Sequence, residues 1–278
     1  MATVVFGLAS ALTWGSGDFG GGLLARRTPL FGVVLASQLV GAVLALVLAV
    51  VRGESAPLPA DLAWSLLGGL AGGIGISALY QGLAVGRMGI VAPITGVVAA
   101  VIPVVAGIVL QGVPTLAVMV GVGLAFVAVV LVSRVSDDRT GPSGVGLALL
   151  AGISIGVFGV VIAQFSDGRV FGPLAVIRGT EALLIGAFVL IGHRTWRPNR
   201  RLWPALAGVG ILDMAGNGTF ILAVQAGSLA VAAVLSSLYP VTTVILASVV
   251  LRERVTRSHA AGIALAVVAI ACITAGSS

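Results

Sequence analysis

The chain has 278 residues, of which 59% are hydrophobic and only 9% are charged, whereas a soluble domain carries roughly 25% charged residues, so this composition excludes a soluble globular protein. The net charge of +6 comes from arginine alone, and nearly all the arginines lie in short connections between apolar runs, which indicates orientation in a membrane and not a nucleic-acid-binding surface. The single cysteine, Cys272, excludes a disulfide framework and a thiolate metal cluster.

Apolar runs follow one another along the whole chain. Each is about 18 residues or longer, enough to cross a bilayer as a helix, and none alternates apolar with polar residues as a membrane β-strand does. The first run has no basic residues before it and extends past the length of a signal peptide, which indicates an uncleaved span. We predict an all-α polytopic membrane protein of ten transmembrane helices, at residues 4–24, 31–51, 63–85, 88–110, 114–133, 143–164, 171–192, 203–225, 228–250 and 258–276.

The first predicted span contains the sequence WGSGDFGGG, residues 14–22. Its glycines at 15, 17 and 20 have the G-x-G-x-x-G spacing of a dinucleotide-binding turn, but that turn needs a preceding strand and a βαβ frame. Within a membrane span, glycines instead favour the close approach of helices, and the third span repeats the pattern between residues 68 and 73. We therefore expect helix packing here, and no cofactor.

Asp18 is the one charged residue of this stretch. Two interpretations are open for it. Either its carboxylate faces an internal cavity, or it lies near the end of the span, where it reaches water or neutralises Arg26 or Arg27. Trp14 shares its helix face, because the two residues are four positions apart.

Prolines interrupt the fourth and ninth predicted spans. Pro93 and Pro103 lie in the fourth span and Pro240 lies in the ninth, and a proline removes a backbone donor from its helix. Transporters built from inverted repeats use broken helices to present backbone groups to a solute near the middle of the membrane. We predict helix breaks at these three positions, with a simple kink as the alternative.

Polar side chains inside the spans are the strongest indication of a functional interior. An ionisable group in hydrocarbon costs at least roughly 2.5–3.5 kcal/mol, so it normally faces the bundle interior or a watery cavity. Arg178 and Glu181 share one helix face, as do Asp213 and Asn217. The candidates for a cavity that binds a solute or carries protons are Trp14, Asp18, Gln38, Tyr80, Gln81, Arg178, Glu181, Asp213, Asn217 and Tyr239.

The buried carboxylates carry a further hypothesis. Low dielectric disfavours the charged form of a carboxylate, so Glu181 and Asp213 are able to take up and release a proton during transport if they face a cavity. The alternative is a structural pair with Arg178. The two histidines, His193 and His259, lie in connections among arginines, which is typical of a cytoplasmic surface and not of a metal site.

The second half of the chain repeats the first. Adding 141 to the residue number aligns 86–128 with 227–269 without a gap, so that Gly86 meets Gly227 and Thr115 meets Thr256. We predict a duplication into residues 1–139 and 140–278 within one membrane domain. Because each half holds five helices, an odd number, the second half is expected to be inverted relative to the first.

The arginines follow this arrangement. Between the ten predicted spans, even-numbered connections hold only Arg52 and Arg169, and Arg178 lies inside a span. The positive-inside rule therefore places the odd-numbered connections in the cytoplasm and both termini outside. The arginines of the odd-numbered connections are at positions 26, 27, 87, 134, 139, 194, 197, 200, 201, 252, 254 and 257.

Three stretches together resemble the drug/metabolite transporter superfamily, in its EamA-type ten-helix branch. They are ALTWGSGDFGGGLLAR, LYQGLAVGRMGIVAPITGVVAAVIP and the C-terminal run from AVQAGSLAVAAVLSSLYP to ACITAG. The second repeat fits the family pattern at Ala226, Ala230, Ala233, Pro240, Glu253, Arg254 and Gly262. The first repeat departs from it, because Gln111 and Gly112 replace the Arg-Glu turn. Family members of known topology have both termini in the cytoplasm, opposite to the arginine count, so both orientations stay open.

The resemblance implies a secondary transporter in the inner (plasma) membrane, with export favoured, that moves small metabolites or drug-like solutes by alternating access. It implies no enzyme activity and no cofactor or metal. Its expected partners are a small-molecule solute and the lipid bilayer, with no nucleic acid; protons as coupling ion and a homodimer stay open. The alternative is a membrane-embedded enzyme or lipid-handling protein, which needs a reactive constellation that the sequence does not display.

Overall fold

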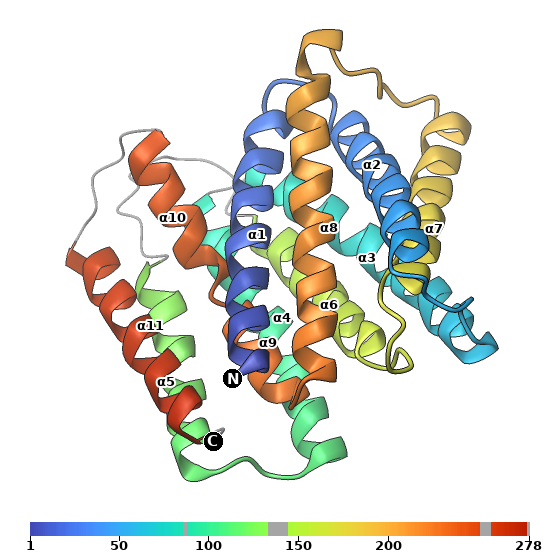
Figure 1. The fold of residues 1–278 in the computed structure, drawn as a ribbon. Coiled ribbons are helices and arrows are strands. Elements are labelled where there is room, and N and C mark those ends of the chain that lie inside the picture. The colour runs from blue at the N-terminus through green and yellow to red at the C-terminus, as the bar shows by residue number, and fades with distance from the viewer. Residues whose placement is uncertain (86–87, 133–143, 251–256, 277–278) are drawn as a thin grey trace.

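Nearly every described residue lies in a helix (Figure 1). The computed structural model describes residues 1–85, 88–132, 144–250 and 257–276, and no strand occurs within these ranges. The helices are α1 (Ala2–Ala25), α2 (Leu30–Val51), α3 (Pro59–Val85), α4 (Met88–Gln111), α5 (Leu116–Val132), α6 (Val145–Ile162), α7 (Phe171–Ile191), η1 (Arg200–Leu202), α8 (Trp203–Gln225), α9 (Leu229–Ser236), α10 (Tyr239–Val250) and α11 (Arg257–Gly276).

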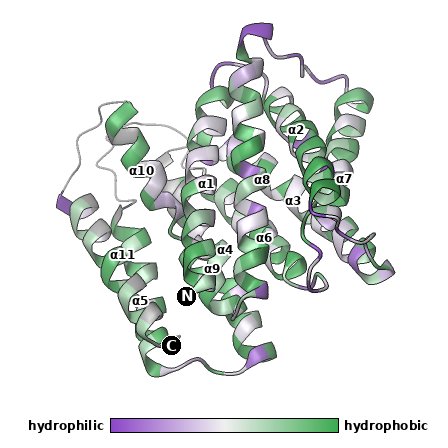
Figure 2. Cartoon of the chain, viewed as in Figure 1, coloured by the Kyte–Doolittle hydropathy of each residue, from purple (hydrophilic) through white to green (hydrophobic). Residues whose placement is uncertain are grey.

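Length and composition make this a polytopic membrane protein. In the described part, six helical segments are long and apolar enough to cross a bilayer: α2, α3, residues Ile94–Gln111 of α4, α6, α7 and the η1–α8 segment. Figure 2 shows hydrophobic residues along the helices and hydrophilic ones gathered in connections such as the one between α7 and α8. Large apolar side chains on the outer faces are solvent-exposed, among them Leu183 at 75% and Ile191 at 81%, as expected for surfaces that meet lipid. Ten spans stay a prediction.

The predicted helix breaks differ in outcome. The ninth predicted span divides into α9 and α10, separated by Ser237 and Leu238, so Pro240 falls in the first turn of α10, where its missing N–H has no partner to lose. Helix α4, in contrast, is continuous from Met88 to Gln111, so the predicted breaks at Pro93 and Pro103 are wrong. A membrane helix tolerates proline where neighbouring helices compensate for the lost bond, and α4 packs against α6 and α9. The side chain of Pro93 lies outside the described residues, as do Arg87 and the connections that carry Arg134, Arg139, Arg252, Glu253 and Arg254.

The helices pack in matching pairs (Figure 1). Helix α1 packs on α8 as α6 packs on α3, and α2 packs on α8 as α7 packs on α3. Helix α1 contacts α9 and α10 as α6 contacts α4, while α2 pairs with α7 and α5 pairs with α11. Exchanging the first five predicted spans with the last five therefore maps each of these pairs onto another of them or onto itself, whereas the contact of α1 with α3 has no counterpart of similar extent between α6 and α8.

The glycines of WGSGDFGGG let α1 approach its neighbours closely. A Cβ at Gly15 would collide with the carbonyl oxygen of Tyr239, and a Cβ at Gly21 would collide with the ring of Tyr80. Gly17 lies against the backbone of α8 near Asp213. The packing interpretation of these glycines is confirmed, because small residues are what allow membrane helices to make such contacts.

The start of α7 is fastened to the connection between α2 and α3. One oxygen of Glu54, Oε2, accepts hydrogen bonds from the backbone N–H groups of Val170, Phe171 and Gly172, at 3.2, 2.8 and 3.0 Å. A carboxylate there satisfies N–H groups that have no partner inside the helix and complements the helix dipole. This contact fixes α7, which carries Arg178 and Glu181, against the first half of the chain.

We predict that Gly15→Ala lowers the thermal stability of the purified protein in detergent, because the added methyl group meets Tyr239 and Thr242 and overpacking costs typically about 1–3 kcal/mol. Gly208→Ala on α8 is the matched control, since nothing lies within 4 Å of a Cβ there. Melting temperatures from circular dichroism check this. Equal melting temperatures for the two variants would contradict the packing role of Gly15.

Candidate functional site

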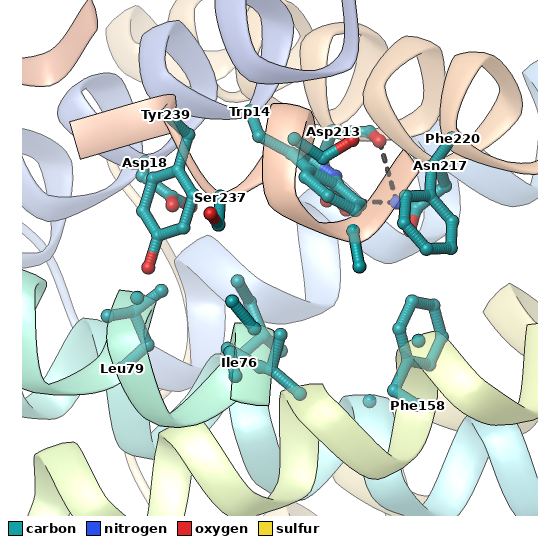
Figure 3. Close-up of a pocket in the computed structure, with 18 of the residues that line it drawn as sticks. Trp14, Asp18, Ile76, Leu79, Phe158, Asp213, Asn217, Phe220, Ser237 and Tyr239 are labelled. Atoms are coloured by element: carbon teal, nitrogen blue, oxygen red, sulfur yellow. Dashed lines mark hydrogen bonds between the residues drawn. The ribbon is translucent and has the colours of Figure 1, made fainter. Parts of the chain in front are cut away.

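A cavity lies at the centre of the bundle, between helices of both halves of the chain (Figure 3). It offers about 90 Å³ to the centres of water-sized molecules, several times the roughly 10–15 Å³ that one water needs. Small and aliphatic residues of α3, α4 and α6 form part of its wall. The polar and aromatic lining residues are Trp14, Asp18, Phe158, Arg178, Glu181, Asp213, Asn217, Phe220, Ser236, Ser237 and Tyr239.

Arg178 is the centre of a buried network that joins three helices. Its Nη1 donates to Oε1 of Gln38 on α2 at 2.6 Å and to Oε2 of Glu181 on α7 at 2.8 Å. Its Nη2 lies 2.9 Å from Oδ2 of Asp213 on α8. The Arg178 and Glu181 side chains are only 3% and 1% exposed, and a buried charge of this kind is tolerated only when it is paired.

Asp213 continues this network along α8. The amide Nδ2 of Asn217, one turn further on, donates to the backbone oxygen of Asp213 at 2.7 Å and to its Oδ1 at 3.2 Å. The Asp213 carboxylate thus contacts both Arg178 and Asn217. Glu181 and Asp213 line the cavity and pair with Arg178 at the same time, so the two interpretations offered for them by the sequence are compatible.

Asp18 faces the cavity without a partner. Within residues 1–85, 88–132, 144–250 and 257–276 it makes no hydrogen bond and no ion pair. Figure 3 shows it beside Ser237 and Tyr239. Arg26, one of the two arginines proposed to neutralise it, instead donates through Nη2 to the backbone oxygen of Leu83 at 3.4 Å, and Arg27 forms no ion pair with Asp18 in the described part of the chain. The geometry therefore favours the cavity position over the anchor.

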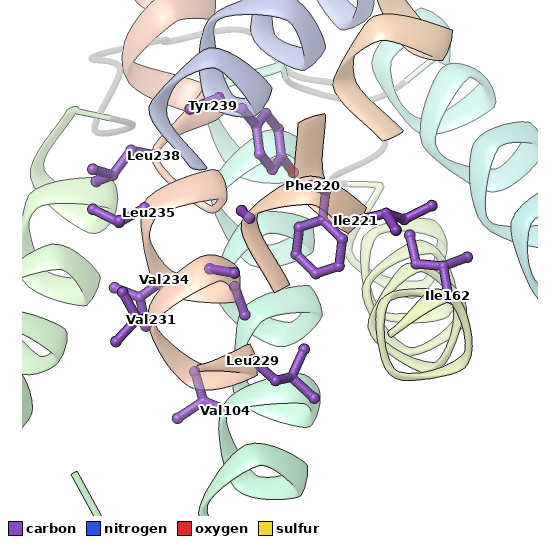
Figure 4. Close-up of a cluster of buried hydrophobic side chains, with 14 of the residues drawn as sticks. Val104, Ile162, Phe220, Ile221, Leu229, Val231, Val234, Leu235, Leu238 and Tyr239 are labelled. Atoms are coloured by element: carbon purple, nitrogen blue, oxygen red, sulfur yellow. The ribbon is translucent and has the colours of Figure 1, made fainter. Parts of the chain in front are cut away.

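Aromatic side chains form much of the apolar wall. The rings of Trp14 and Phe220 have centroids 5.6 Å apart, and Phe158 lies opposite Asn217 and Phe220 (Figure 3). Phe220 and Tyr239 also belong to the buried hydrophobic cluster that continues below the cavity through α9 (Figure 4). The wall is thus held by the packed core, which limits its movement.

Three candidates lie outside the cavity wall. Gln38 is fully buried and accepts a hydrogen bond from Arg178 without lining the cavity. Tyr80 is 1% exposed and packs against Gly21 of α1, while Gln81 is half-buried and does not line the cavity.

The sequence prediction missed Phe158, Phe220 and the two serines after α9 as lining residues. Pro103 lines the cavity without breaking its helix. Apolar residues of a membrane helix carry no sign of which ones face a cavity, so only the serines next to the predicted break at Pro240 offered a signal.

Comparisons with known proteins give a family. Residues 1–134 and 142–275 match the EamA-like transporter family. A crystal structure described simply as that of a protein has a TM-score of 0.79 to this chain, at 18% sequence identity, over 98% of both chains; at this identity the likeness shows the fold alone. No curated protein matches the sequence.

We predict that Arg178→Gln strongly destabilises the protein, because it leaves Glu181 and Asp213 buried without their cation. Removing one partner of a buried pair costs about 3–5 kcal/mol. Thermal unfolding in detergent measures the loss. The triple variant Arg178→Gln, Glu181→Gln, Asp213→Asn removes all three charges and is expected to recover most of the stability. An unchanged melting temperature for Arg178→Gln alone would rule out the network as a structural element.

Proposed function

Because this chain belongs to the EamA-like transporter family, whose members move small solutes across membranes, we propose that it is a secondary transporter that works by alternating access. The observation that carries the proposal is the central cavity, which combines unpaired and paired charges with aromatic walls. Ionisable residues within membrane helices mark solute or ion pathways when they face a water-filled space.

The positions that line the cavity support a duplicated architecture in which the solute site lies between the two halves of the chain. With the shift of 141 residues that aligns the two halves, six lining positions fall on six other lining positions. The first set lies on α1, α3 and α4, and the second lies on α6, α8 and the break between α9 and α10. The pairs are Trp14 with Ile155, Asp18 with Gly159, Gly72 with Asp213, Ile76 with Asn217, Leu79 with Phe220 and Gly96 with Ser237. Solute sites of inverted-repeat transporters lie at the interface between the repeats.

We assign the repeats to residues 1–139 and 140–278, with opposite orientation because each holds five predicted spans. The equivalence of helix neighbours in the two halves supports this assignment. Rocking of one half against the other then exposes the cavity to each side in turn. The arginine bias favours both termini outside an inner (plasma) membrane. Export of the solute is the working direction that the family resemblance favours.

Among the three carboxylates of the cavity, we propose Asp18 as the first candidate for the residue that carries the coupled proton. The guanidinium of Arg178 forms ion pairs with Glu181 and Asp213, whereas Asp18 has no such cation in the described part of the chain. The groups that surround it in the cavity are Tyr239 on α10 and the Arg178 network on α7 and α8. Because a low-dielectric site disfavours an unpaired charge, a carboxylate without a cation is the group whose charge a bound proton offsets.

We predict that liposomes with the purified protein and a trapped pH-sensitive dye show faster collapse of a pH gradient when a transported solute is added. The solutes to test are a panel of amino acids, amines and sugars, with protein-free liposomes as the control for leakage. Asp18→Asn is expected to abolish the solute-dependent pH change, because the variant side chain cannot bind a proton.

Glu181→Gln and Asp213→Asn test the two paired carboxylates in the same assay. Full pH-driven flux in all three variants would show that no cavity carboxylate carries the proton. Failure of every solute to move, in protein that binds a solute in detergent, would contradict transport itself.

A further inference from the structure

The charges of the cavity do not balance. Among its described lining residues stand three carboxylates, Asp18, Glu181 and Asp213, and one cation, Arg178. The guanidinium of Arg178 is already shared, since it lies 2.8 Å from Glu181 and 2.9 Å from Asp213. With all four groups ionised the cavity therefore carries an excess of negative charge, which is costly in a low-dielectric interior until a positive charge enters.

Two carboxylate groups also have oxygens that remain free to accept. Asp18 makes no hydrogen bond in the described part of the chain. Glu181 is only 1% exposed, and it uses Oε2 for Arg178, while Oε1 lies over Gly72 at the place that a Cβ would fill. An acceptor buried to this degree is normally satisfied by a donor. The absence of a side chain at Gly72 leaves room for this oxygen at the cavity wall.

The net charge of the cavity opposes an anionic solute. Several lining donors are already used: the amide of Asn217 donates to Asp213, the hydroxyl of Ser237 donates to the backbone oxygen of Val234 at 2.7 Å, and that of Ser236 is directed to the backbone oxygen of Gly7 at 3.4 Å. Nε of Arg178, the indole N–H of Trp14 and the hydroxyl of Tyr239 donate to no partner in the described part of the chain. A phosphate or carboxylate would find these donors, but it would add its charge to the negative excess.

The walls suit an organic cation. Trp14, Phe158, Phe220 and Tyr239 line the cavity, and aromatic faces attract cations, with tryptophan the strongest. Ile76 and Leu79 provide an apolar surface beside them. In the described residues no group of three or more His, Cys, Asp or Glu is arranged to hold a metal ion, so these walls favour an organic cation over an inorganic one.

We infer that the cavity binds a small solute with a protonated amine on an apolar or aromatic body, and that Asp18 is the counter-ion of the amine. The ammonium group donates to Asp18 at the end of the cavity that Ser237 and Tyr239 share, and the apolar body lies toward Trp14 and Phe220 (Figure 3). The inference rests on the proposed function only in taking this cavity as the solute site.

Three probes of matched shape and different charge test it. They are 2-phenylethylamine as the cation, 2-phenylethanol as the neutral isostere and 3-phenylpropionate as the anion, each titrated by calorimetry into the full-length protein in detergent at neutral pH. We expect the amine to bind about tenfold or more tightly than the alcohol, the difference made by one hydrogen bond between charged groups. The acid is expected to bind most weakly.

Asp18→Asn is the decisive variant, because it keeps the shape of the side chain and removes its charge. It is expected to lose the preference for the amine while binding of the alcohol stays unchanged, which also shows that the variant is folded. Asp167→Asn is the control: this carboxylate is exposed in the connection before α7, and the variant is expected to bind all three probes as the unmodified protein does.

The outcomes separate the two proposals. Equal binding of amine and alcohol to the unmodified protein, or an amine preference that survives Asp18→Asn, overturns the cation site. The unmodified protein gives this answer even if the variant does not fold. Flux of neutral or anionic solutes in the liposome assay would leave the transport function standing and remove only the cation inference. Binding of the amine without flux of any solute would do the reverse.

Discussion

The ion pairs of Arg178 are the interaction on which the site depends. One guanidinium reaches Gln38 on α2, Glu181 on its own helix and Asp213 on α8, so it sets the spacing of three helices around one side of the cavity. The close approach of α1 on the other side depends on glycine, since Gly15, Gly17 and Gly21 meet the backbone or ring of a neighbour. Charge pairing and small residues are the two means of holding helices together where lipid supplies no hydrophobic drive between them.

The sequence predicts an interaction of this structure when the two residues lie close together along the chain, and not when the interaction joins different helices. The pairs Arg178 with Glu181 and Asp213 with Asn217 lie within one turn of a helix, so residue spacing alone brings them together. The contact between Arg178 and Asp213 depends on the rotation of two helices about their axes, which no local pattern reports. The same holds for Phe158 and Tyr80, which both lie on long apolar helices. Phe158 lines the cavity, whereas Tyr80 packs against Gly21 of α1, and no local pattern distinguishes the two positions.

Helix α4 shows where a local rule gives way to packing. Proline predicts a break from its missing donor, yet α4 continues past Pro103, and a break occurs only beside Pro240. The aligned positions show the same difference: Ser237 lies at the break, whereas the corresponding Gly96 lies inside α4. Both positions line the cavity. At this position of the wall, the first half of the chain contributes a continuous helix and the second half contributes the end of a helix.

This asymmetry extends to the chemistry of the wall. In the aligned pairs, Asp18 stands opposite Gly159 in the sequence register, and Asp213 stands opposite Gly72. A duplication with equal halves would place a second copy of each carboxylate in the cavity and increase the repulsion between them. A glycine at the equivalent position removes that repulsion and leaves room, as Gly72 does for the free oxygen of Glu181. The negative excess that we assign to binding a cation is therefore limited to the carboxylates of Asp18, Glu181 and Asp213 against the single guanidinium of Arg178 among the described lining residues.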